Sequence, residues 1–423
     1  MMRSLFNTTE PLAGKRILLG ICGSIAAYKS PEIVRELTLL GAEVRVVMTR
    51  SAAQFVTPIT LQALSGQAVR QDLFAAEEEA AMDHIRLARW PDAIVVAPVS
   101  AHSLARFALG LADDLLSTLL LVTHAPIFLA PAMNASMWAH PATQAHLRQL
   151  CEYGMQLLGP EAGALACGEE GTGRMLEPEQ IVAQLRLALA PKILAGKQVL
   201  ITAGPTWESL DPARGLSNRA SGKQGFALAR ACAEAGARVQ LISGPSQEAT
   251  PPGVLRENVT SAQEMLEATL RALAIPTDLF IANAAVADHR PALQSTEKLP
   301  KTAIAEQLTL TVNPDIVSSV HQHARRPRLI VAFAAETQDH LDSARDKATR
   351  KGADIMIVND ISQRHTGMGA ESNACSILEG SDLTEIPTCS KIDLARHLIR
   401  HIAENHFASK VTEQHGTVTN SHS

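Results

Sequence analysis

The chain has 423 residues, 46% of them hydrophobic, 19% charged and only 3% aromatic. This balance excludes a disordered chain and predicts two or three globular domains with aliphatic cores, as in parallel sheets covered by helices. The formal net charge of −5 excludes a basic surface for nucleic acid. The six cysteines are scattered and form no C-x-x-C pair. The sequence shows neither a signal peptide nor an apolar run of membrane length. These features favour a reducing, cytoplasmic compartment.

The same opening pattern occurs twice along the chain. Residues 13–24 and 195–206 each contain a basic residue, an apolar strand and a glycine turn. Each opening is followed by a helix pattern and a second strand, at residues 41–49 and 236–245. A strand–helix–strand unit used twice predicts two α/β domains with a boundary near Pro191–Gly196. The expected divisions are an N-terminal extension (1–13), a first domain (14–190), a linker (191–195), a second domain (196–405) and a disordered tail (406–423).

Further apolar runs alternate with helical patterns in both halves. The first helix has Pro31 in its first turn, an apolar face that includes Ile33 and Leu37, and Gly41 at its end. The alternation predicts two Rossmann-like domains with parallel sheets flanked by helices, whose ligands bind beyond the carboxyl ends of the strands. Further strands are expected at Ala93–Ala97, Ile127–Leu129, Val199–Thr202, Leu279–Ala282, Leu329–Phe333 and Asp354–Val358.

The glycine turn after the first strand indicates a phosphate site. Gly23 and Ser24 precede a helix, where backbone N–H groups can approach a phosphate. The third glycine of a G-x-G-x-x-G motif is missing and no acidic ribose anchor is evident, which favours a mononucleotide such as FMN over a dinucleotide. A tight turn without any ligand is the alternative for this segment taken alone.

Other loops of the first half carry polar residues at the same predicted edge. Ser100 and Asn134 follow two strands, and Ser117 lies in a small-residue segment between them. Turn chemistry is the simpler explanation for an isolated Asn134, and a structural or solvated role is the simpler one for His84. Cys167 lies in the glycine-rich segment 166–175, which has the composition of a loop. A cysteine there is not expected to fill a core, so a catalytic role is favoured.

The second half combines basic, acidic and small residues in the pattern of a nucleotide site. The segment 221–225 reads Ser-Gly-Lys-x-Gly before a helix, a plausible phosphate cradle, although a capped helix start has the same appearance. Asp288 after a strand suits Mg²⁺ beside phosphates. Lys298 lies in a polar loop, and Lys347 and Lys351 share one helix face. Solvated surface cations are the alternative for each lysine.

These segments together resemble a known family. The motifs around Gly20–Lys29, Ala97–Thr118, Pro131–Asn134 and Ala166–Met175 are similar to those of the flavin-dependent cysteine decarboxylases. From about Gly14 to about Asn405 the chain resembles the bifunctional phosphopantothenoylcysteine decarboxylase/phosphopantothenate–cysteine ligases of coenzyme A synthesis. The resemblance implies that 4′-phosphopantothenate is joined to cysteine using CTP, through an acyl cytidylate. It also implies that 4′-phosphopantothenoylcysteine is then decarboxylated to 4′-phosphopantetheine using FMN.

In the first half the resemblance assigns three catalytic positions. His84 matches the catalytic histidine, Asn134 the residue that binds the substrate carboxylate, and Cys167 the proton donor to the enethiol intermediate. FMN supplies the electron sink that lets the carboxylate leave. The FMN-binding positions implied are Gly23, Ser24, Ile25, Thr49, Ser100 and Ser117.

In the second half the resemblance assigns substrate and nucleotide positions. Asn218 matches the residue that orients the acyl intermediate, with Arg214 and Ala285 beside that substrate, and Lys298 is assigned to catalysis. Asp288 is expected to hold Mg²⁺. The CTP-binding positions implied are Ala282, Asn283, Ala284, Asp288, Lys298, Pro314, Asp315, Ile316, Val317, Phe333, Lys347 and Lys351.

The second half also departs from the family pattern. An aromatic residue usually follows the arginine, where this chain has Gly215. Ala220 and Gln224 replace a serine and a methionine of the usual Ser-Ser-Gly-Lys-Met-Gly motif. Pro300 and Val312 also differ from the expected residues. None of these positions carries an assigned catalytic role, but substrate or CTP affinity is expected to be sensitive to them.

Two other functions fit the same architecture. One is a simple flavin or nicotinamide oxidoreductase, and the other is a non-catalytic, flavin-binding regulatory subunit. The missing third glycine argues against the first, and the presence of His84 and Cys167 argues against the second. The resemblance further implies a homo-oligomer, a dodecamer built from trimers, with flavin sites at subunit interfaces and dimeric ligase domains.

Overall fold

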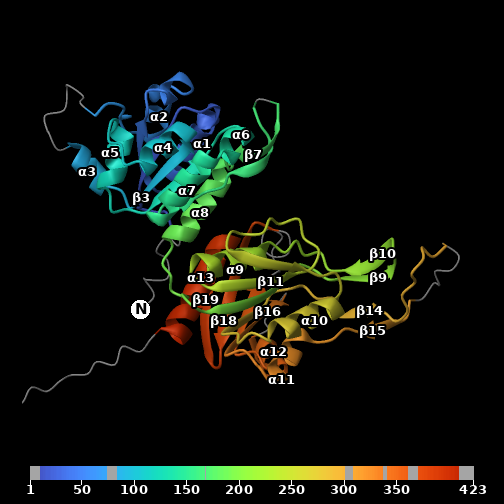
Figure 1. Ribbon diagram of the computed structural model, residues 1–423. Helices are drawn as coiled ribbons and strands as arrows, with labels where there is room; N and C mark the ends of the chain where they lie inside the picture. The colour runs from blue at the N-terminus through green and yellow to red at the C-terminus, as the bar shows by residue number, and fades with distance from the viewer. Residues whose placement is uncertain are drawn as a thin grey trace, which may run out of the picture. The chain divides into compact units, whose positions relative to one another are not determined.

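The computed structural model describes residues 10–73, 83–166, 168–300, 308–336, 341–360 and 370–408. The chain separates into two compact units, an N-terminal unit (Glu10–Ala190) and a C-terminal unit that begins at Pro191. Figure 1 shows the N-terminal unit in blue to green and the C-terminal unit in yellow-green to red. Each unit is built around its own sheet.

The N-terminal unit contains a five-stranded parallel sheet of order β2-β1-β3-β4-β5. Every residue of β3 is buried, as expected for a central strand covered on both faces. A separate hairpin, β6–β7, follows the sheet. The strands are β1 (Arg16–Ile21), β2 (Glu43–Met48), β3 (Ala93–Val99), β4 (Ile127–Pro131), β5 (Gln156–Leu157), β6 (Glu161–Ala164) and β7 (Glu170–Arg174).

Helices cover both faces of this sheet. Side chains alternate along β1, so that Ile17 and Leu19 pack with one helix layer and Leu18 with the other. The first layer contains α1, α2 and α8, and the second contains α3, α4, α5 and α7. The helices are η1 (Ile25–Lys29), α1 (Ser30–Leu39), η2 (Ala52–Gln54), α2 (Pro58–Ser65), α3 (Asp83–Arg89), α4 (Ala101–Ala108), α5 (Leu115–Val122), α6 (Ala135–Ala139), α7 (Pro141–Glu152) and α8 (Pro178–Leu189).

The C-terminal unit contains an eight-stranded mixed sheet of order β12-β11-β8-β13-β16-β17-β18-β19. The strands from β12 to β17 are parallel, whereas β18 and β19 are antiparallel additions at one edge that the sequence did not predict. The sheet strands are β8 (Gln198–Ala203), β11 (Arg238–Ser243), β12 (Val254–Asn258), β13 (Leu279–Ala282), β16 (Leu329–Glu336), β17 (Ile355–Asp360), β18 (Ser372–Glu379) and β19 (Asp382–Ser390).

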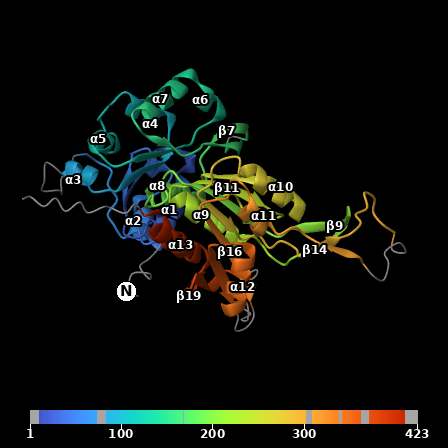
Figure 2. The same ribbon diagram turned by 90° about the horizontal axis from the view of Figure 1, so that it is seen from below.

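Two short antiparallel ladders leave this sheet as a projecting arm. They are β9–β10 (Trp207–Asp211 with Arg214–Ser217) and β14–β15 (His289–Pro291 with Leu310–Val312). Strands β9 and β14 lie against each other, and both views show the two ladders side by side (Figures 1 and 2). The arm follows β8 and β13, and therefore begins at the carboxyl edge of the sheet.

Helices also cover both faces of the C-terminal sheet. Helices α10 and α11 pack on one face with Leu200, Phe280 and Ile330, and α9 and α13 pack together on the other. The last helix continues into a π-helical turn, η4 (Ala403–Phe407), where His406 pairs with Glu379 at 2.9 Å. The helices are α9 (Lys223–Glu234), α10 (Ala262–Ala272), α11 (Ile316–Gln322), α12 (Leu341–Lys351) and α13 (Lys391–Ile402).

The expected N-terminal extension and C-terminal tail each contain residues that pack on the neighbouring unit. Leu12 is fully buried and Glu10 pairs with Arg186 at 2.9 Å, so residues 10–13 pack on the N-terminal unit. His406 and Phe407 pack on the C-terminal unit, where Phe407 lies near the Arg328 guanidinium. The exact domain boundaries drawn from the sequence stay a prediction. Within the described parts of the chain, no helix is long and apolar enough to cross a membrane.

A buried ion pair joins α9 to α13. Arg396 donates from Nε and Nη2 to the two carboxylate oxygens of Glu234, at 2.8 and 3.0 Å. Both side chains are less than a tenth exposed, at 7% and 6%. Such a paired charge is tolerated in a protein interior, but an unpaired one is strongly unfavourable.

We predict that Arg396→Ala lowers the free energy of unfolding of the C-terminal unit by about 3–5 kcal/mol, because it removes the guanidinium that pairs with the buried Glu234 carboxylate. The matched control is Arg271→Ala, which breaks an ion pair of similar length with Glu257 whose side chains are 63% and 39% exposed. That change should amount to less than about 1 kcal/mol. Scanning calorimetry of the full chain measures both, and equal effects of the two substitutions would contradict the prediction.

Candidate functional sites

The loops that follow the strands of the N-terminal sheet surround two adjoining cavities. The hairpin-side cavity, of about 710 Å³, is lined by the loops after β1, β3 and β4 and by the β6–β7 hairpin. The α5-side cavity, of about 830 Å³, is lined by the loops after β1, β2 and β3 and by the start of α5. Gly23, Ser100, Ala101 and Met137 belong to both linings, so the two cavities meet at the carboxyl edge of the sheet.

Five of the six predicted FMN positions lie on these walls. Gly23, Ser24, Ile25 and Ser100 line the hairpin-side cavity, and Thr49 lines the α5-side cavity. The exception, Ser117, is buried and lines neither one. Its hydroxyl donates to the Asp114 carboxylate at 2.7 Å within a capping box at the start of α5. The geometry therefore gives Ser117 a helix-capping role, and its predicted flavin contact stays a prediction.

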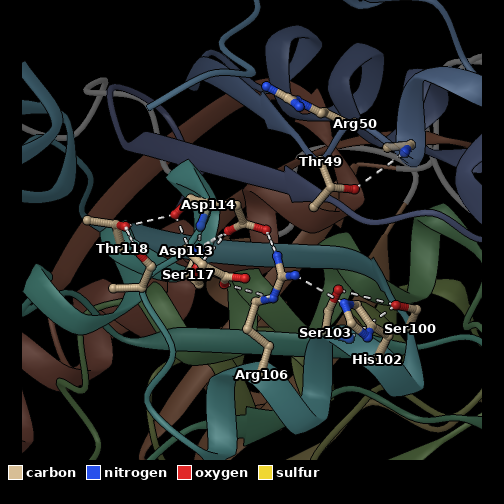
Figure 3. Close-up of polar contacts among 12 residues, drawn as sticks. Thr49, Arg50, Ser100, His102, Ser103, Arg106, Asp113, Asp114, Ser117 and Thr118 are labelled. Atoms are coloured by element: carbon tan, nitrogen blue, oxygen red, sulfur yellow. Dashed lines mark hydrogen bonds and ion pairs between the residues drawn. The ribbon is translucent and has the colours of Figure 1, made fainter. Parts of the chain in front are cut away.

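A polar network on the wall of the α5-side cavity joins the loops that surround it. Arg106 pairs with Asp114 and, at 3.1 Å, with Asp113, while its Nη2 lies 3.1 Å from His102 Nε2. Figure 3 shows Arg106 at the centre of this network, between the residues of α4 and those of the 113–118 segment. The Ser100 hydroxyl accepts from the Ser103 backbone N–H at 3.3 Å and so caps α4. The network therefore ties two segments of the cavity wall together.

Close backbone contacts shape the hairpin-side cavity. A Cβ at Gly173 would lie 2.3 Å from the Met133 carbonyl oxygen, and the Met133 N–H donates to the Gly173 carbonyl at 3.0 Å. A Cβ at Gly23 would lie 2.5 Å from Ser51 Cβ. Only glycine allows these approaches. The contact at Gly173 holds strand β7 against the loop that carries Asn134, and the contact at Gly23 holds the loop after β1 against the segment after β2. This shape suits a flat ring system between backbone segments.

The three predicted catalytic residues of the first half are placed differently. Asn134 lines the hairpin-side cavity, where its Nδ2 donates to the Glu169 carboxylate at 2.6 Å. Cys167 lies outside the described residues, but Leu165 and Ala166 just before it line the same cavity. His84 lies on α3, half-exposed, and is not among the residues that line either cavity.

The carboxyl edge of the C-terminal sheet surrounds one cavity of about 570 Å³, the C-terminal cavity. Its walls come from the loops after β8 and β13, from residues of β16, β17 and α12, and from the starts of α9, α11 and α13. Thirteen predicted positions line it: Asn218, Ala282, Asn283, Ala284, Ala285, Asp288, Pro314, Asp315, Ile316, Val317, Phe333, Lys347 and Lys351.

Hydrogen bonds position several of these side chains. Asn218 Nδ2 donates to the carbonyl oxygens of Ala285 and Val286 at 3.1 and 3.2 Å, which joins the two predicted substrate residues. Lys351 pairs with Asp315 at 3.0 Å. Burial alone would raise the pKa of Asp315, but the Ser318 N–H and the Lys351 ammonium outweigh burial and lower it. Asp315 therefore stays ionised and caps α11 through the Ser318 N–H at 3.1 Å.

Arg214 and Lys298 do not line the C-terminal cavity in a single copy of the chain. Arg214 instead pairs with Asp211 in the turn between β9 and β10, and its Nη2 donates to the Leu299 carbonyl at 2.6 Å. The Leu299 N–H donates to Asp211 at 3.2 Å. Asp211 thus holds both Arg214 and the backbone next to Lys298 on the projecting arm.

One departure from the family pattern has a local explanation. A Cβ at Gly215 would lie 2.6 Å from the ring of Trp207 on the facing strand. The indole of Trp207 therefore lies where a side chain at position 215 would begin. An aromatic residue on β9 takes the place of the one expected on β10, so the arm keeps an aromatic ring at this point.

Comparisons with known proteins agree with this two-part organisation. Residues 5–189 match the Flavoprotein family model, and residues 194–406 match that of the DNA/pantothenate metabolism flavoprotein C-terminal domain. The coenzyme A biosynthesis bifunctional protein CoaBC of Vibrio vulnificus is 46% identical over 93% of this chain and 98% of its own length. The CoaBC protein of Escherichia coli K12 is also 46% identical, over 86% and 90%.

A solved C-terminal domain of a CoaBC protein is 32% identical, with a TM-score of 0.43, and covers 50% of this chain and 97% of that domain. The sequence matches define a bifunctional flavoprotein with a decarboxylase half and a ligase half. More particularly, the chain belongs to the CoaBC family of coenzyme A biosynthesis, whose members are phosphopantothenoylcysteine decarboxylases and phosphopantothenate–cysteine ligases. The predicted α/β fold and the predicted function are confirmed at this level.

The Asp211 contacts predict an unusual titration. Burial alone would raise the pKa of Asp211, but the Arg214 side chain and the N–H groups of Ala213, Leu299 and Arg214 outweigh burial and lower the pKa to about 2. Because the folded-state pKa is depressed, the stability that this carboxylate contributes is fully present above its ordinary pKa of 3.8. That contribution is lost as the pH falls from there towards 2.

We expect ¹³C NMR of the aspartate-labelled protein to show a carboxyl signal that stays ionised at pH 3, because its donors favour the charged form. The signal should be absent from the Asp211→Asn spectrum, which serves as the assignment control. An Asp211 signal that titrates near its ordinary pKa would contradict the arrangement of the arm described above.

Proposed function

We propose that the C-terminal cavity binds CTP and 4′-phosphopantothenate and catalyses the ligation in two steps. The observation that carries this proposal is the convergence of thirteen predicted positions on a single cavity wall. First, a carboxylate oxygen of 4′-phosphopantothenate attacks the α-phosphorus of CTP, and pyrophosphate leaves with the electron pair of the broken P–O bond. The amine of cysteine then attacks the acyl carbon, forms the amide and expels CMP, while a proton passes to solvent.

The side chains on the wall support these roles. Lys347 and Lys351 supply positive charge for the nucleotide phosphates, and Asn218 orients the acyl group beside Ala285. Asp288 offers one carboxylate to Mg²⁺, which prefers oxygen ligands and commonly combines one or two carboxylates with substrate phosphates. The described residues contain no group of three acidic, histidine or cysteine side chains that could hold a metal ion by itself. The phosphate oxygens would therefore complete the magnesium coordination.

We propose that Lys298 and Arg214 act on a neighbouring copy of the chain. Arg214 belongs to β10 and Lys298 lies between β14 and β15, so both belong to the arm whose ladders Figure 1 shows. Neither lines the cavity of its own copy. A dimer of ligase units would let each arm complete the cavity of its partner. A larger homo-oligomer, a dodecamer, would similarly bring His84 of α3 to the flavin site of a second copy.

We predict that Lys298→Gln lowers the rate of CTP-dependent pyrophosphate release at least about tenfold, because a cation facing the departing phosphates is removed. Lys301→Gln, three positions further along the sequence, is the matched control and should retain most of the activity. Initial rates with saturating 4′-phosphopantothenate and cysteine measure both variants. Equal rates for Lys298→Gln and the unaltered protein would remove Lys298 from the mechanism.

We propose that the adjoining N-terminal cavities hold FMN and 4′-phosphopantothenoylcysteine. The flavoprotein family match implies FMN, and the glycine contacts and serine hydroxyls on the walls fit it. The chemistry that FMN supplies when bound is reversible hydride acceptance, which provides the electron sink for loss of CO₂. Asn134 binds the substrate carboxylate from its place on the wall, and His84 assists thiol oxidation. Cys167 donates the proton when the enethiol that remains after CO₂ has left is reduced, and the hydride taken up by FMN would supply the two electrons.

Cys167→Ser should bind FMN and release CO₂ but form 4′-phosphopantetheine at least about 100-fold more slowly, because the proton donor is missing. Cys151→Ser, an exposed cysteine of the same unit, is the control and should behave as the unaltered protein. Mass spectrometry follows the oxidised intermediate, and flavin absorbance follows FMN. Normal product formation by Cys167→Ser would assign proton donation to another group.

The cytoplasmic location expected from the sequence stays a prediction.

A further inference from the structure

The Asn134 side chain on the wall of the hairpin-side cavity is oriented by bonds at both ends of its amide. Its Oδ1 accepts from the Ser136 backbone N–H at 2.8 Å, which caps the start of α6. Because that bond identifies the amide oxygen, the donor end is the one that meets Glu169, at 2.6 Å from Nδ2 to Oε2. The acceptor is a carboxylate, so the hydrogen bond is charge-assisted. A carboxylate of the chain itself thus occupies this donor.

The same donor is the one that the proposed decarboxylation uses for the substrate carboxylate. Glu169 offers the same chemical group to the same amide. Asn134 Nδ2 carries two hydrogens, yet two carboxylates bound to one nitrogen lie within about 5 Å of each other. Their like charges repel, and they repel more strongly in a partly enclosed cavity than in water. Binding of one carboxylate therefore disfavours binding of the other.

Backbone packing sets the position of Glu169 relative to the amide. Strand β7, which begins directly after Glu169, lies against α6 (Figure 1). A Cβ at Gly171 would lie 2.7 Å from Ala135 Cβ, and the Met133 N–H donates to the Gly173 carbonyl at 3.0 Å. These contacts lie on both sides of Asn134 in the sequence. The approach of the two side chains is consequently a property of the fold around them.

The Glu169 side chain can leave the amide without disturbing the hairpin. It is exposed, whereas the other end of β7 is anchored. There the buried Lys29 ammonium donates to the Met175 carbonyl at 3.2 Å and pairs with Glu177 at 2.9 Å. The Glu169 backbone is held separately, since its carbonyl accepts from the Leu165 N–H at 2.8 Å. Exchange of carboxylates therefore requires only the rotation of one solvated side chain.

We propose that Glu169 is a specificity-determining residue of the decarboxylase half, because its carboxylate competes with the substrate carboxylate for Asn134. A ligand with a carboxylate, such as 4′-phosphopantothenoylcysteine, displaces Glu169 and binds less tightly for that reason. Once the carboxylate has left as CO₂, Glu169 returns to the amide. The competition lowers the affinity for the carboxylated ligand relative to the decarboxylated one, since specificity is a difference of affinities. The inference rests on the proposed role of Asn134.

The test uses two inhibitors that differ only in the carboxylate. They are 4′-phosphopantothenoylalanine and the ethylamide of 4′-phosphopantothenate, and neither can be oxidised, because neither has a thiol. Their dissociation constants are measured from changes in flavin absorbance of the full-length, FMN-loaded protein without CTP. Glu169→Ala should lower the constant of the carboxylate inhibitor about three- to tenfold, the ratio expected for one exposed, charge-assisted hydrogen bond. The constant of the ethylamide should stay unchanged.

Two further variants separate competition from general effects of charge. Glu169→Gln should give an intermediate value, because a neutral carbonyl is a weaker acceptor than a carboxylate. Glu170→Gln is the matched control, since it removes the same charge from the next residue, which is also exposed, and should change neither constant. A carboxylate inhibitor that binds Glu169→Ala no more tightly than the unaltered protein overturns the proposal. Equal tightening of both inhibitors overturns it as well, as does weaker binding, which a purely structural role of Glu169 predicts.

Asn134→Ala distinguishes failure of this inference from failure of the proposed function. If Asn134 binds the substrate carboxylate, this variant should bind the carboxylate inhibitor at least about tenfold more weakly. Adding Glu169→Ala to it should then change nothing, because the shared partner is gone. Unchanged binding by Asn134→Ala would refute the proposed role of Asn134. Weaker binding there, with Glu169 variants that behave as the unaltered protein does, would refute only the competition. Ethylamide binding shows that each variant is folded.

Discussion

Parallel strands joined by helices have their carboxyl ends at one edge of a sheet. The chain must leave that edge through a loop after each strand, so residues far apart in sequence are collected in one place. In the N-terminal unit this constraint brings Ser24, Thr49, Ser100 and Asn134 to adjoining cavities. In the C-terminal unit it brings Asn218, Asp288 and Phe333 to another. Both activities of the CoaBC family are thus supported by the same property of the sheet.

The antiparallel strands of the C-terminal unit extend this arrangement. Strand β17 ends at the carboxyl edge, so its antiparallel neighbour β18 begins there, and β19 returns to the same edge. Asn373 near the start of β18 and Lys391 just after β19 consequently face the cavity. The buried pair between Glu234 and Arg396 holds α13 against α9, which keeps Lys391 beside Gln224. The last part of the chain therefore contributes to a site begun almost 170 residues earlier, at Lys223.

Much of the fold was predictable because apolar runs and glycine turns are local signals. The strand expected at Leu279–Ala282 has those bounds, and the others expected from the sequence lie within a few residues of the observed ones. The strands of the arm and the edge pair β18–β19 were not predicted. Their sequences are short or half-exposed, and alternation in them competes with turn residues. The tertiary structure decides which strands these segments pair with, and that choice leaves no pattern in the local sequence.

The candidate sites were predictable where a residue directly follows a strand, as Ser100 and Asn134 do. Ser117 was ambiguous from the sequence, because a serine in the first helical turn can also take part in capping the helix, as it does here with Asp114. Lys391 was not predicted to line the C-terminal cavity, because a lysine at the start of a late helix has the sequence pattern of a solvated cation. Only its burial beside Lys223 distinguishes it from such a cation. Arg214 and Lys298 lie on the projecting arm and do not line the C-terminal cavity of their own copy, which no local pattern in the sequence indicates.

The most direct test of the central claim, that two separate sites act in sequence on one substrate, is a single incubation of the full chain. The purified, FMN-loaded protein receives 4′-phosphopantothenate, cysteine, Mg²⁺ and either CTP or ATP, and pyrophosphate, CO₂ and 4′-phosphopantetheine are measured together. The account predicts equal amounts of all three products with CTP, and much less of each with ATP. Pyrophosphate without CO₂, or no pyrophosphate with either nucleotide, would contradict it for the corresponding half of the chain.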